Sequence, residues 1–596
     1  MNETLRNFHR THYCGTLTAA EIGQTVSVCG WVAKQRDLGN LIFIDCRDRT
    51  GILQLSFNDA TAPEVFDKAK ECRSEFVVAA TGTLCRREAV NPELPTGEVE
   101  LMVTELRILG RAETPPFEII PDSPVKEELR LKYRYLDLRR PDLQQNILMR
   151  HKIVKAARDY YDSQGFIEIE TPILVKSTPE GARDFLVPSR IHGGSFYALP
   201  QSPQLYKQLL MVSGFDRYVQ FARCFRDEDL RADRQPEFTQ IDVEMSFVDI
   251  EDILSVSEGF IAHIFKTILG REIPTPLPRL TYREAMEKYG SDKPDTRFGM
   301  LIEDLTDLVK GSGFSVFSSA CETGSVRGIC AKGGAAAFSR KDCDKLTEYV
   351  RGIGAKGLAW AKYTEEGISA SFGKFVTPEE LSAIAQRLGA EQGDMIFIIA
   401  DGKNKTVLSV LGALRCEVAK RLGCIPEDTF SFLWITQFPF FEWDEDTQTF
   451  VAMHHPFTSP MEDDIPLLDS DKGNVRAKAF DLVLNGIELS SGSIRITDPA
   501  LQKRMFYALG LSDEEASEKF GFLTDAFRFG APPHGGMAIG LDRLIMQMLG
   551  RETLRDVVAF PKVQNMTELM TGCPSGVDPL QLTELSIAVS KENAKD

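Results

Sequence analysis

The sequence predicts an α+β protein of several domains, and three observations lead to this fold class. The chain has 596 residues, which is more than one hydrophobic core usually organises. The first hundred or so residues consist of short runs in which apolar and polar residues alternate, as in β-strands. Later segments mix long helical patterns with further strands, so neither kind of element is confined to one part of the chain.

The apolar runs, the cysteine spacing and the net charge of the chain show which classes of protein are unsuitable. No apolar run approaches the length of a membrane span, and Met1–Arg10 is too polar for a secretory signal. The twelve cysteines form no C-x-x-C pair, which argues against a zinc cluster and suits free thiols in the cytoplasm. The net charge of −18 weighs only weakly against a nucleic-acid partner, because local basic patches can still bind phosphate.

Residues 1–112 are predicted to form a small β-barrel. A helix is expected over Ala62–Cys72, between the third and fourth of five strands. This order of elements is typical of an OB-fold, which often binds oligonucleotides. The predicted strands are Thr25–Val32, Asn40–Asp48, Ile52–Phe57, Glu75–Arg87 and Val99–Leu109.

Alternation in the second and third strands places Phe43 and Gln54 on the outside of this barrel. The nearby loop Lys34–Gly39 contains Arg36 and Asp37, so a stacking ring, a polar side chain and a phosphate contact would occur together. Stacking on such a ring contributes roughly 1–3 kcal/mol per base. The alternative is that Phe43 packs against a neighbouring strand or domain.

The segment from Cys29–Val32 to Ile44–Asp48 resembles the anticodon-binding barrel of the aspartyl-, asparaginyl- and lysyl-tRNA synthetases. The resemblance implies a tRNA partner. It also implies an anticodon-reading role for four residues, namely Arg36, Asp37, Phe43 and Gln54.

Residues 113–140 are predicted to be a hinge, because four prolines lie between Pro115 and Pro124. A helix is expected over about Leu143–Gln164, followed by a short strand that Pro172 ends. Helix, strand and proline in this order resemble motif 1 of the class II aminoacyl-tRNA synthetases, which implies a homodimer. Without that comparison, any α/β unit could end this way.

Residues 141–292 also contain two strands around a highly charged loop. In the returning strand Asp242 and Glu244 share one face, and buried polar groups must be paired or must face a ligand. A surface hairpin with a solvated tip is the alternative. The stretch Phe225–Glu244 closely resembles motif 2 of the class II synthetases, in which the first arginine grips the α-phosphate of ATP. The implied ATP contacts are Arg226, Asp227, Glu228 and Gln235.

Residues 293–424 are rich in glycine and contain amphipathic helices, one of them over Pro378–Leu388. No catalytic constellation is visible there. A segment of this size at this place resembles the inserted domain of the bacterial aspartyl-tRNA synthetase family, so an inserted α+β domain is predicted. The second part of the catalytic domain is expected over residues 425–560 and a polar C-terminal extension over residues 561–596.

The stretch Pro533–Arg543 predicts a strand that turns into a helix. Arg543 lies in the first helical turn, where free N–H groups favour anions, although many helices simply begin with an arginine. The pattern G-x-D-R after an apolar strand resembles motif 3, in which the arginine binds the γ-phosphate of ATP. The implied ATP contacts are Gly540, Leu541, Asp542 and Arg543.

A turn is expected at Ser491-Gly492, which would place Glu488 and Arg495 on adjacent antiparallel strands. By the same resemblance, Asp481 and Glu488 hold Mg²⁺ against the ATP phosphates, a role that suits oxygen ligands. Seven residues apart on one strand, these two side chains would face opposite ways. A bulge at Asn485-Gly486 is therefore expected as well.

The stretch Gln201–Gln208 resembles the form that this segment takes in the aspartyl-tRNA synthetase family. The resemblance implies that Lys207 and Arg495 contact the side-chain carboxylate of the substrate. A neutral amide would leave this desolvated cation pair uncompensated, at a cost upwards of about 1–3 kcal/mol. Sites of this kind discriminate by roughly 10⁴–10⁵. A solvated lysine on a helix is the alternative for Lys207.

The remaining implied aspartate contacts are Glu180, Gln204, Arg226, Asp242 and His454. Glu180 matches the residue that holds the substrate ammonium in the family, and His454 matches a substrate contact. His454 is followed by another histidine, but adjacent side chains point apart in a strand, so a metal site is not predicted here.

Neither a P-loop nor a dinucleotide-binding glycine motif occurs in the chain. The family resemblance implies an aspartate–tRNA ligase that uses ATP and Mg²⁺ to form aspartyl-adenylate and then charges tRNA(Asp). Arg226, Arg543 and Glu488 would be its catalytic residues. One alternative is a non-discriminating enzyme that also charges the asparagine tRNA, although Leu38 resembles the residue of tRNA-selective members. A non-catalytic RNA-binding relative would be expected to lack one of the catalytic residues.

Overall fold

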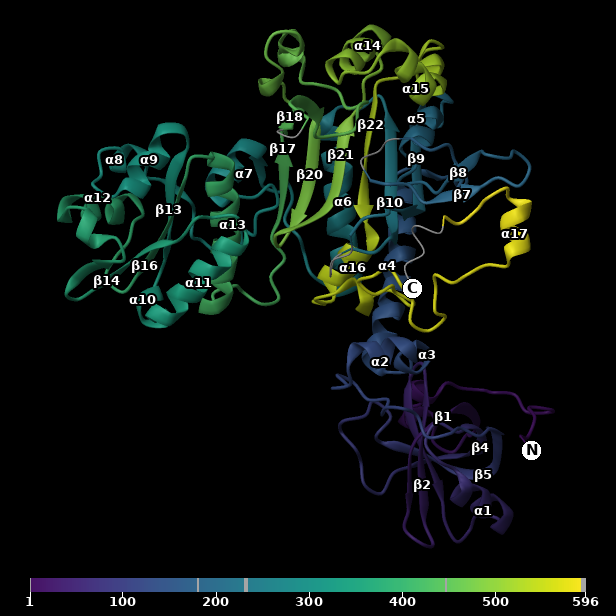
Figure 1. Cartoon of the computed structure of the whole chain (residues 1–596). Helices are drawn as coiled ribbons and strands as arrows, with labels where there is room; N and C mark the ends of the chain where they lie inside the picture. Colours follow the sequence, from purple (N-terminus) through teal and green to yellow (C-terminus); the bar gives the residue numbers. More distant parts are fainter. Residues whose placement is uncertain (1, 179–181, 230–233, 445–446, 591–596) are drawn as a thin grey trace. The chain divides into compact units, whose positions relative to one another are not determined.

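The structure is a computed structural model that describes residues 2–178, 182–229, 234–444 and 447–590 (Figure 1). The chain is organised as two units, which are described separately below. One unit comprises the residues up to 151 together with 553–576, and the other comprises most of the remaining chain. Among the described residues, no helix is both long and apolar enough to cross a membrane.

The first unit begins with a closed barrel of five strands in the order β1-β2-β3-β5-β4, which confirms the predicted OB-fold. The barrel interior is filled by alternate side chains, and Ile42, Ile44, Leu53 and Leu55 are completely buried. The elements are β1 (Thr25–Asp37), β2 (Ile42–Asp48), β3 (Gly51–Phe57), α1 (Pro63–Glu71), β4 (Val77–Arg86) and β5 (Val99–Gly110).

The rest of the first unit is a helical segment that Arg134 joins to the residues after 552. The Arg134 guanidinium donates hydrogen bonds to the carbonyl oxygens of Arg555, Val558 and Ala559. The Asn146 amide donates to the Asp556 carbonyl at 3.0 Å. The helices concerned are α2 (Glu127–Lys132), α3 (Arg134–Asp137) and the start of α4 (Pro141–Ser163).

The second unit is built on an eight-stranded sheet in the order β11-β17-β20-β21-β22-β10-β9-β6. The six central strands are antiparallel, as predicted, whereas the edge pairs β11–β17 and β6–β9 are parallel. Long connections separate the strands of both edge pairs, which parallel pairing requires. The strands are β6 (Ile167–Glu168), β9 (Arg217–Phe225), β10 (Glu237–Ser246), β11 (Arg279–Thr281), β17 (Phe432–Thr436), β20 (Ala479–Leu484), β21 (Ile487–Ile494) and β22 (His534–Gly540).

Helices flank this sheet, as Figure 1 shows for α4 and α6. The indole of Trp434 in β17 donates to the Glu258 carboxylate of α6 at 3.0 Å, which ties that helix to the sheet. A cluster of phenylalanines joins α5 to α14 and α15. The helices are α5 (Gln204–Val212), α6 (Ile250–Leu269), α7 (Tyr282–Tyr289), α14 (Pro499–Ala508), α15 (Asp513–Phe527) and α16 (Leu541–Met548). Short hairpins are formed by β7 (Leu186–Pro188) with β8 (Phe196–Ala198) and by β18 (Phe441–Asp444) with β19 (Thr449–Ala452).

Between α7 and β17, the chain forms a separate five-stranded antiparallel sheet in the order β12-β13-β16-β14-β15. Two buried apolar clusters link this sheet to its helices. Its elements are β12 (Glu303–Asp304), α8 (Thr306–Val309), α9 (Ser315–Thr323), β13 (Ser325–Ala331), α10 (Gly334–Ala337), α11 (Arg340–Gly352), β14 (Ala359–Thr364), β15 (Gly367–Ala370), α12 (Pro378–Arg387), β16 (Met395–Asp401) and α13 (Asn404–Leu422). A last helix, α17 (Pro579–Glu584), lies in the polar tail.

Candidate active site

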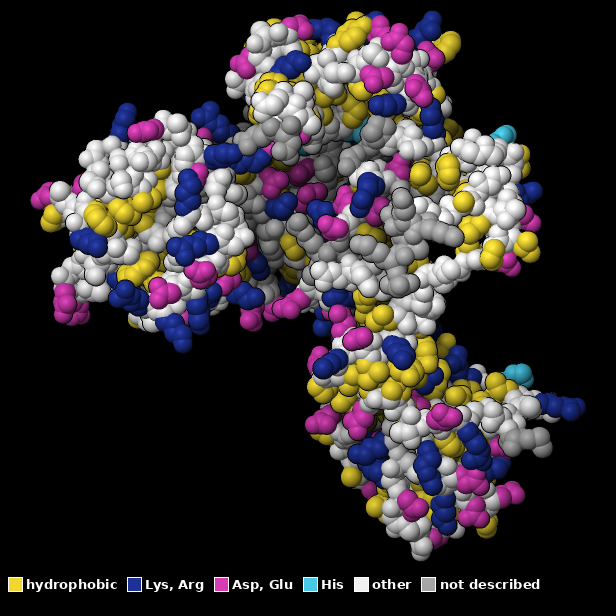
Figure 2. All heavy atoms as spheres, in the orientation of Figure 1, with side chains coloured by type: hydrophobic (Ala, Val, Ile, Leu, Met, Phe, Trp, Pro, Cys, Tyr) yellow, Lys and Arg dark blue, Asp and Glu magenta, His cyan; other side chains and the backbone are white. Residues whose placement is uncertain are grey.

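Four buried charges meet on one face of the large sheet. Lys207 projects from α5 with its side chain 2% exposed, and its ammonium group lies 2.7 Å from the Asp242 carboxylate and 3.3 Å from that of Glu244. Arg495, just beyond β21, donates to both carboxylate oxygens of Glu244 at 2.9 and 3.1 Å. Asp242 and Glu244 are two residues apart on β10, so they face the same side and join the two cations. Figure 2 shows acidic and basic side chains gathered in the recess over this sheet.

Lys207 and Arg495 each already have a carboxylate partner within the fold, Asp242 for the lysine and Glu244 for the arginine. An isolated buried charge would cost several kcal/mol, whereas paired and hydrogen-bonded charges are tolerated. Glu244 is fully buried between the two cations and was missed as a site residue. Its position on the same strand face as Asp242 was the available signal.

The two carboxylates differ in how readily they bind a proton. Burial raises the pKa of Asp242 to about 6, although Lys207 partly offsets this effect. Burial would also raise the pKa of Glu244, but Arg495 and Lys207 outweigh it and lower that pKa to about 2. Glu244 is therefore a fixed anion. Asp242 titrates near neutral pH, and its Oδ2 has no hydrogen-bond partner among the described residues.

His454 and His455 are largely shielded from water, and His455 lies close enough to Arg495, Lys207 and Glu244 for their charges to interact. Burial lowers the pKa of His454 to about 4. Burial, followed by the charges of Arg495 and Lys207, lowers the pKa of His455 to about 3. His455 accepts a hydrogen bond from the Phe457 amide through Nδ1. Among the described residues, no three His, Cys, Asp or Glu side chains form a group suited to a metal ion.

We expect His455 to make the fold sensitive to mild acid. The histidine of the unfolded chain binds a proton below a pH of about 6.5, whereas the buried folded form stays neutral down to a pH of about 3. Stability is therefore lost as pH falls through this window, by up to about 1.4 kcal/mol per pH unit. Chemical unfolding of the wild type and His455→Asn between pH 7 and 5 measures the difference. If the free energy of unfolding depended on pH equally in both proteins, His455 would not be held neutral in the folded state.

A second group of site residues begins with Arg226, which directly follows β9. The guanidinium lies 5.2 Å from the centre of the Phe238 ring, and its Nε has no hydrogen-bond partner among the described residues. In the loop that follows, Glu228 pairs with Arg234 at 2.8 Å, and the Asp227 amide donates to the Arg183 carbonyl. Gln235 is 6% exposed. The guanidinium lies near an aromatic ring and has an unused donor, and a planar guanidinium group suits binding of a phosphate.

Strand β22 and helix α16 bring Arg543 to the same face. Its Nη1 donates to the Glu488 carbonyl at 3.1 Å. Asp542 is buried and accepts a hydrogen bond from the Thr239 amide of β10, which ties the start of α16 to the neighbouring strand. Leu541 is also buried. The side chains of Asp542 and Leu541 therefore support the position of Arg543, and Gly540 begins the helix.

The predicted turn at Ser491-Gly492 is wrong, because the β20–β21 hairpin turns at Asn485-Gly486. Both turn residues have positive φ, 52° and 82°, as Asn-Gly pairs in tight hairpin turns do. Glu488 and Arg495 consequently lie along one strand and its extension rather than on adjacent strands. The expected bulge is also displaced: Leu489 is the extra residue in the β20–β21 register.

The hairpin places Asp481 and Glu488 close enough for their charges to interact. Burial raises the pKa of Asp481 well above its ordinary value, and the Glu488 carboxylate adds to this increase. Asp481 Oδ1 is buried without a hydrogen-bond partner among the described residues. Two adjacent carboxylates with an unused buried oxygen fit Mg²⁺, which prefers oxygen ligands and takes the remainder from phosphates and water.

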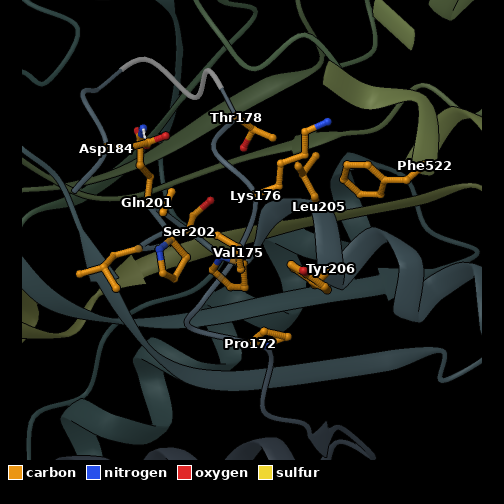
Figure 3. A pocket seen from close by; sticks show the side chains of 14 residues that line it. Pro172, Val175, Lys176, Thr178, Asp184, Gln201, Ser202, Leu205, Tyr206 and Phe522 are labelled. Carbon is orange, nitrogen blue, oxygen red and sulfur yellow. Dashed lines mark hydrogen bonds between the residues drawn. The ribbon is translucent and has the colours of Figure 1, made fainter. Parts of the chain in front are cut away.

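A cavity of about 40 Å³ is lined in part by Leu205 and Tyr206 of α5, the helix that also carries Lys207. Figure 3 shows Asp184, Gln201 and Tyr206 among the residues that line it. The Gln201 amide donates to the Ala182 carbonyl at 2.8 Å and to the Asp184 carboxylate at 2.6 Å. Glu180, predicted to hold the substrate ammonium, lies outside the described residues. Gln204 Nε2 is buried at the start of α5 without a partner among the described residues.

The sequence predicts Gln54 on the outside of the barrel, open to a base, and the structure corrects its exposure. It lies on the outer side of β3 but is only 5% exposed, because three charged side chains cover it. Its Oε1 accepts from Arg36 at 2.9 Å and from Arg87 at 2.8 Å, and its Nε2 donates to Glu100 at 2.6 Å. Arg87 and Glu100 were not predicted, since they reach Gln54 from other strands.

The other barrel residues have more local contacts. Phe43 is half-buried, and the Arg36 guanidinium lies 5.5 Å from the centre of its ring. Arg36 also pairs with Asp45 at 3.0 Å. Asp37 accepts a hydrogen bond from the Gly39 amide and so shapes the β1–β2 loop.

The chain forms an OB-type barrel and then a largely antiparallel sheet that carries Arg226 and Arg543. This is the architecture of class II aminoacyl-tRNA synthetases. Residues 126–564 match the family model described as "tRNA synthetases class II (D, K and N)". Residues 26–109 match that of the "OB-fold nucleic acid binding domain". The chain belongs to the D, K and N family of class II tRNA synthetases, and it is an enzyme of that kind.

Relatives and solved structures agree with this assignment. The chain is 57% identical to "Aspartate--tRNA ligase" of Ruminiclostridium cellulolyticum, covering 99% of this chain and 100% of the relative. It is 55% identical to "Aspartate--tRNA(Asp/Asn) ligase" of Caldanaerobacter subterraneus, with the same coverage. The aspartyl-tRNA synthetase structure of Entamoeba histolytica is 20% identical and shares the fold, with a TM-score of 0.57 over 93% of this chain and 92% of that one.

Proposed function

We propose that this protein is an aspartate–tRNA ligase that activates L-aspartate with ATP and transfers it to the 3′ end of tRNA(Asp). The observation that carries the proposal is the buried pair Lys207 and Arg495 on the sheet face that also holds Arg226 and Arg543. The names of relatives that are 55–57% identical over nearly the full chain support it.

In the first step, the α-carboxylate of aspartate attacks the α-phosphate of ATP in line and displaces pyrophosphate. Arg226 neutralises charge at the α-phosphate, and Arg543 holds the γ-phosphate, so the barrier falls through positioning and electrostatics. Asp481 and Glu488 would hold Mg²⁺, which neutralises phosphate charge when it is bound. The terminal ribose hydroxyl of tRNA then attacks the adenylate carbonyl and releases AMP.

Selection of aspartate follows from the paired cations. The incoming side-chain carboxylate accepts hydrogen bonds from Lys207 and Arg495, while Glu244 keeps both cations in place. Asp242 Oδ2 offers an acceptor to the substrate ammonium. By family resemblance Glu180 holds the same ammonium group, and Gln204, whose Nε2 is a hydrogen-bond donor, is a further aspartate contact. An asparagine amide would place its N–H₂ group against the N–H donors of Lys207 and Arg495, so a buried donor that faces the substrate would lack an acceptor, at a cost of about 1–3 kcal/mol.

A second candidate function is charging of both the aspartate and the asparagine tRNAs. The relatives from Caldanaerobacter subterraneus and Lachnoclostridium phytofermentans, 55% and 54% identical, carry the name "Aspartate--tRNA(Asp/Asn) ligase". Leu38, which is 69% exposed in the β1–β2 loop, favours the selective enzyme by family resemblance. We expect purified tRNA(Asp) to be charged with aspartate far faster than tRNA(Asn). Equal rates would establish the non-discriminating function, and no charging of either would refute both.

We also propose a cytoplasmic homodimer. At the β6 edge of the large sheet, three apolar side chains are about half exposed, namely Ile167, Ile173 and Leu174. An open sheet edge with exposed apolar side chains can pair with the same edge of a second copy. All twelve cysteines are free, which suits a reducing compartment. Light scattering that returns the mass of a single chain would refute the dimer.

A further inference from the structure

The insert contains a buried arginine that is bound to backbone rather than to a carboxylate. Arg415 on α13 is 1% exposed. Its guanidinium donates to the carbonyls of Asp295 and Phe298 at 2.8 Å, of Gly299 at 2.9 and 3.1 Å, and of Met300 at 3.2 Å. Among the described residues it forms no ion pair. A buried cation needs such acceptors, so Arg415 holds residues 291–300, here called the strap, in one conformation.

The strap begins at a second tight contact with the same helix. Gly290, which ends α7, has a φ of 68°, and a Cβ there would lie 2.1 Å from the Leu408 carbonyl of α13. A Cβ on Gly412 would lie 2.6 Å from the Gly290 carbonyl. The two backbones therefore meet without intervening side chains. Helix α13 thus contacts the residue just before the strap, Gly290, and holds the strap itself through Arg415.

The other side of the strap contacts the turn of the β20–β21 hairpin. The Thr296 and Ser431 hydroxyls are hydrogen-bonded at 2.8 Å, and the Ser431 amide donates to the Asn485 side chain at 2.9 Å. A Cβ on Gly486 would lie 3.1 Å from the Cβ of Asp295. The strap thus contacts Asn485 through Ser431 and Gly486 directly. This turn sets the relative position of β20, which carries Asp481, and β21, which carries Glu488.

We propose that Arg415 is a positioning residue for the divalent-cation and ATP-phosphate site. It fixes the strap, the strap fixes the Asn485-Gly486 turn, and the turn keeps Asp481 and Glu488 at the spacing that the ion requires. The inference rests on the proposed function, which assigns these carboxylates to the ion. It gives the inserted domain a defined part in nucleotide binding.

Arg421 provides a matched control on the same helix. It is partly exposed and pairs with Glu417 one turn away at 2.7 Å, and among the described residues it forms no hydrogen bond or ion pair with the strap. Replacing it by methionine removes the same charge and length from α13. The Arg421→Met protein should behave as the wild type.

The test compares Arg415→Met, Arg415→Lys and Arg421→Met with the wild type. ATP binding is measured by calorimetry over a range of Mg²⁺ concentrations and in EDTA, and hydrogen–deuterium exchange is followed in residues 479–494. Arg415→Met should weaken Mg²⁺-dependent ATP affinity by about 10- to 100-fold, as loss of a supporting contact behind a metal ligand does. In Arg415→Met, hydrogen–deuterium exchange in the hairpin should also accelerate. Its ATP affinity in EDTA and its KM for aspartate should stay unchanged. Arg415→Lys should recover part of the lost ATP affinity.

A folded Arg415→Met protein with wild-type Mg²⁺ dependence and hairpin exchange would overturn the inference. If that variant does not fold, Thr296→Val removes the hydroxyl contact to Ser431 without exposing a buried charge. It should shift the Mg²⁺ dependence in the same direction by a smaller factor, and no shift would again overturn the inference. Pyrophosphate exchange by the wild type is measured in parallel. Its absence with aspartate would refute the proposed function, whereas the binding measurements test Arg415 separately.

Discussion

Replacing Lys207 by methionine is expected to reduce kcat/KM for aspartate activation by roughly 10²- to 10⁴-fold. The reason is that Asp242 and Glu244, both fully buried, lose their shared cation, and breaking a buried pair costs about 3–5 kcal/mol. The aspartate carboxylate would also lose one of its two cationic donors. Pyrophosphate exchange at varied aspartate concentration measures the effect.

The more diagnostic result is the selectivity of this variant. The ratio of aspartate to asparagine activation should fall sharply in Lys207→Met, because the site keeps Asp242 and Glu244 but loses one of its two cations and no longer favours the acid over its amide. Lys266→Met is a suitable control, since Lys266 is exposed and pairs with Glu272 at 3.2 Å. Circular dichroism checks that both variants fold. A folded Lys207→Met enzyme with an unchanged ratio would contradict the proposed basis of specificity.

Replacing Arg226 by methionine is expected to lower the rate of pyrophosphate exchange by about 10²- to 10³-fold, the usual effect of losing one preorganised donor to a developing charge. The guanidinium lies 5.2 Å from the centre of the Phe238 ring, a distance at which cation and ring attract each other. Arg226→Lys should recover little activity, because an ammonium group keeps the charge but not the planar fork. Single-turnover formation of the adenylate measures the step directly.

Arg223 supplies the control for this experiment. It lies three residues earlier on β9, is partly exposed and pairs with Glu237 at 2.7 Å. Arg223→Met should exchange pyrophosphate at close to the wild-type rate, which separates loss of a positive charge on this strand from loss of the phosphate contact. Adenylate formation at the wild-type rate in Arg226→Met would remove Arg226 from the mechanism.

Several elements could be predicted from the sequence because their signals are local. The five barrel strands and α1 follow from alternation and spacing, and the helix after Gly540 follows from its apolar stripe. The hairpin turn was placed wrongly although its signal was also local. Asn485-Gly486 is the stronger hairpin turn, whereas Gly492 lies in mid-strand, where a Cβ would come within 2.5 Å of the Phe480 ring.

The sequence by itself determined the kinds of domain, their order and the identity of the charged residues in the motifs. Only the tertiary structure decided how those charges are paired. Lys207, Glu244 and Arg495 are far apart along the chain, and each buried charge takes whichever partner the fold brings within reach. The hydrogen bonds from charged side chains to Gln54, and those from Arg415 to the strap, likewise join residues that only the fold brings together. Hydrogen bonds and ion pairs act over a few ångströms, and no local pattern specifies which distant residues will meet at that range.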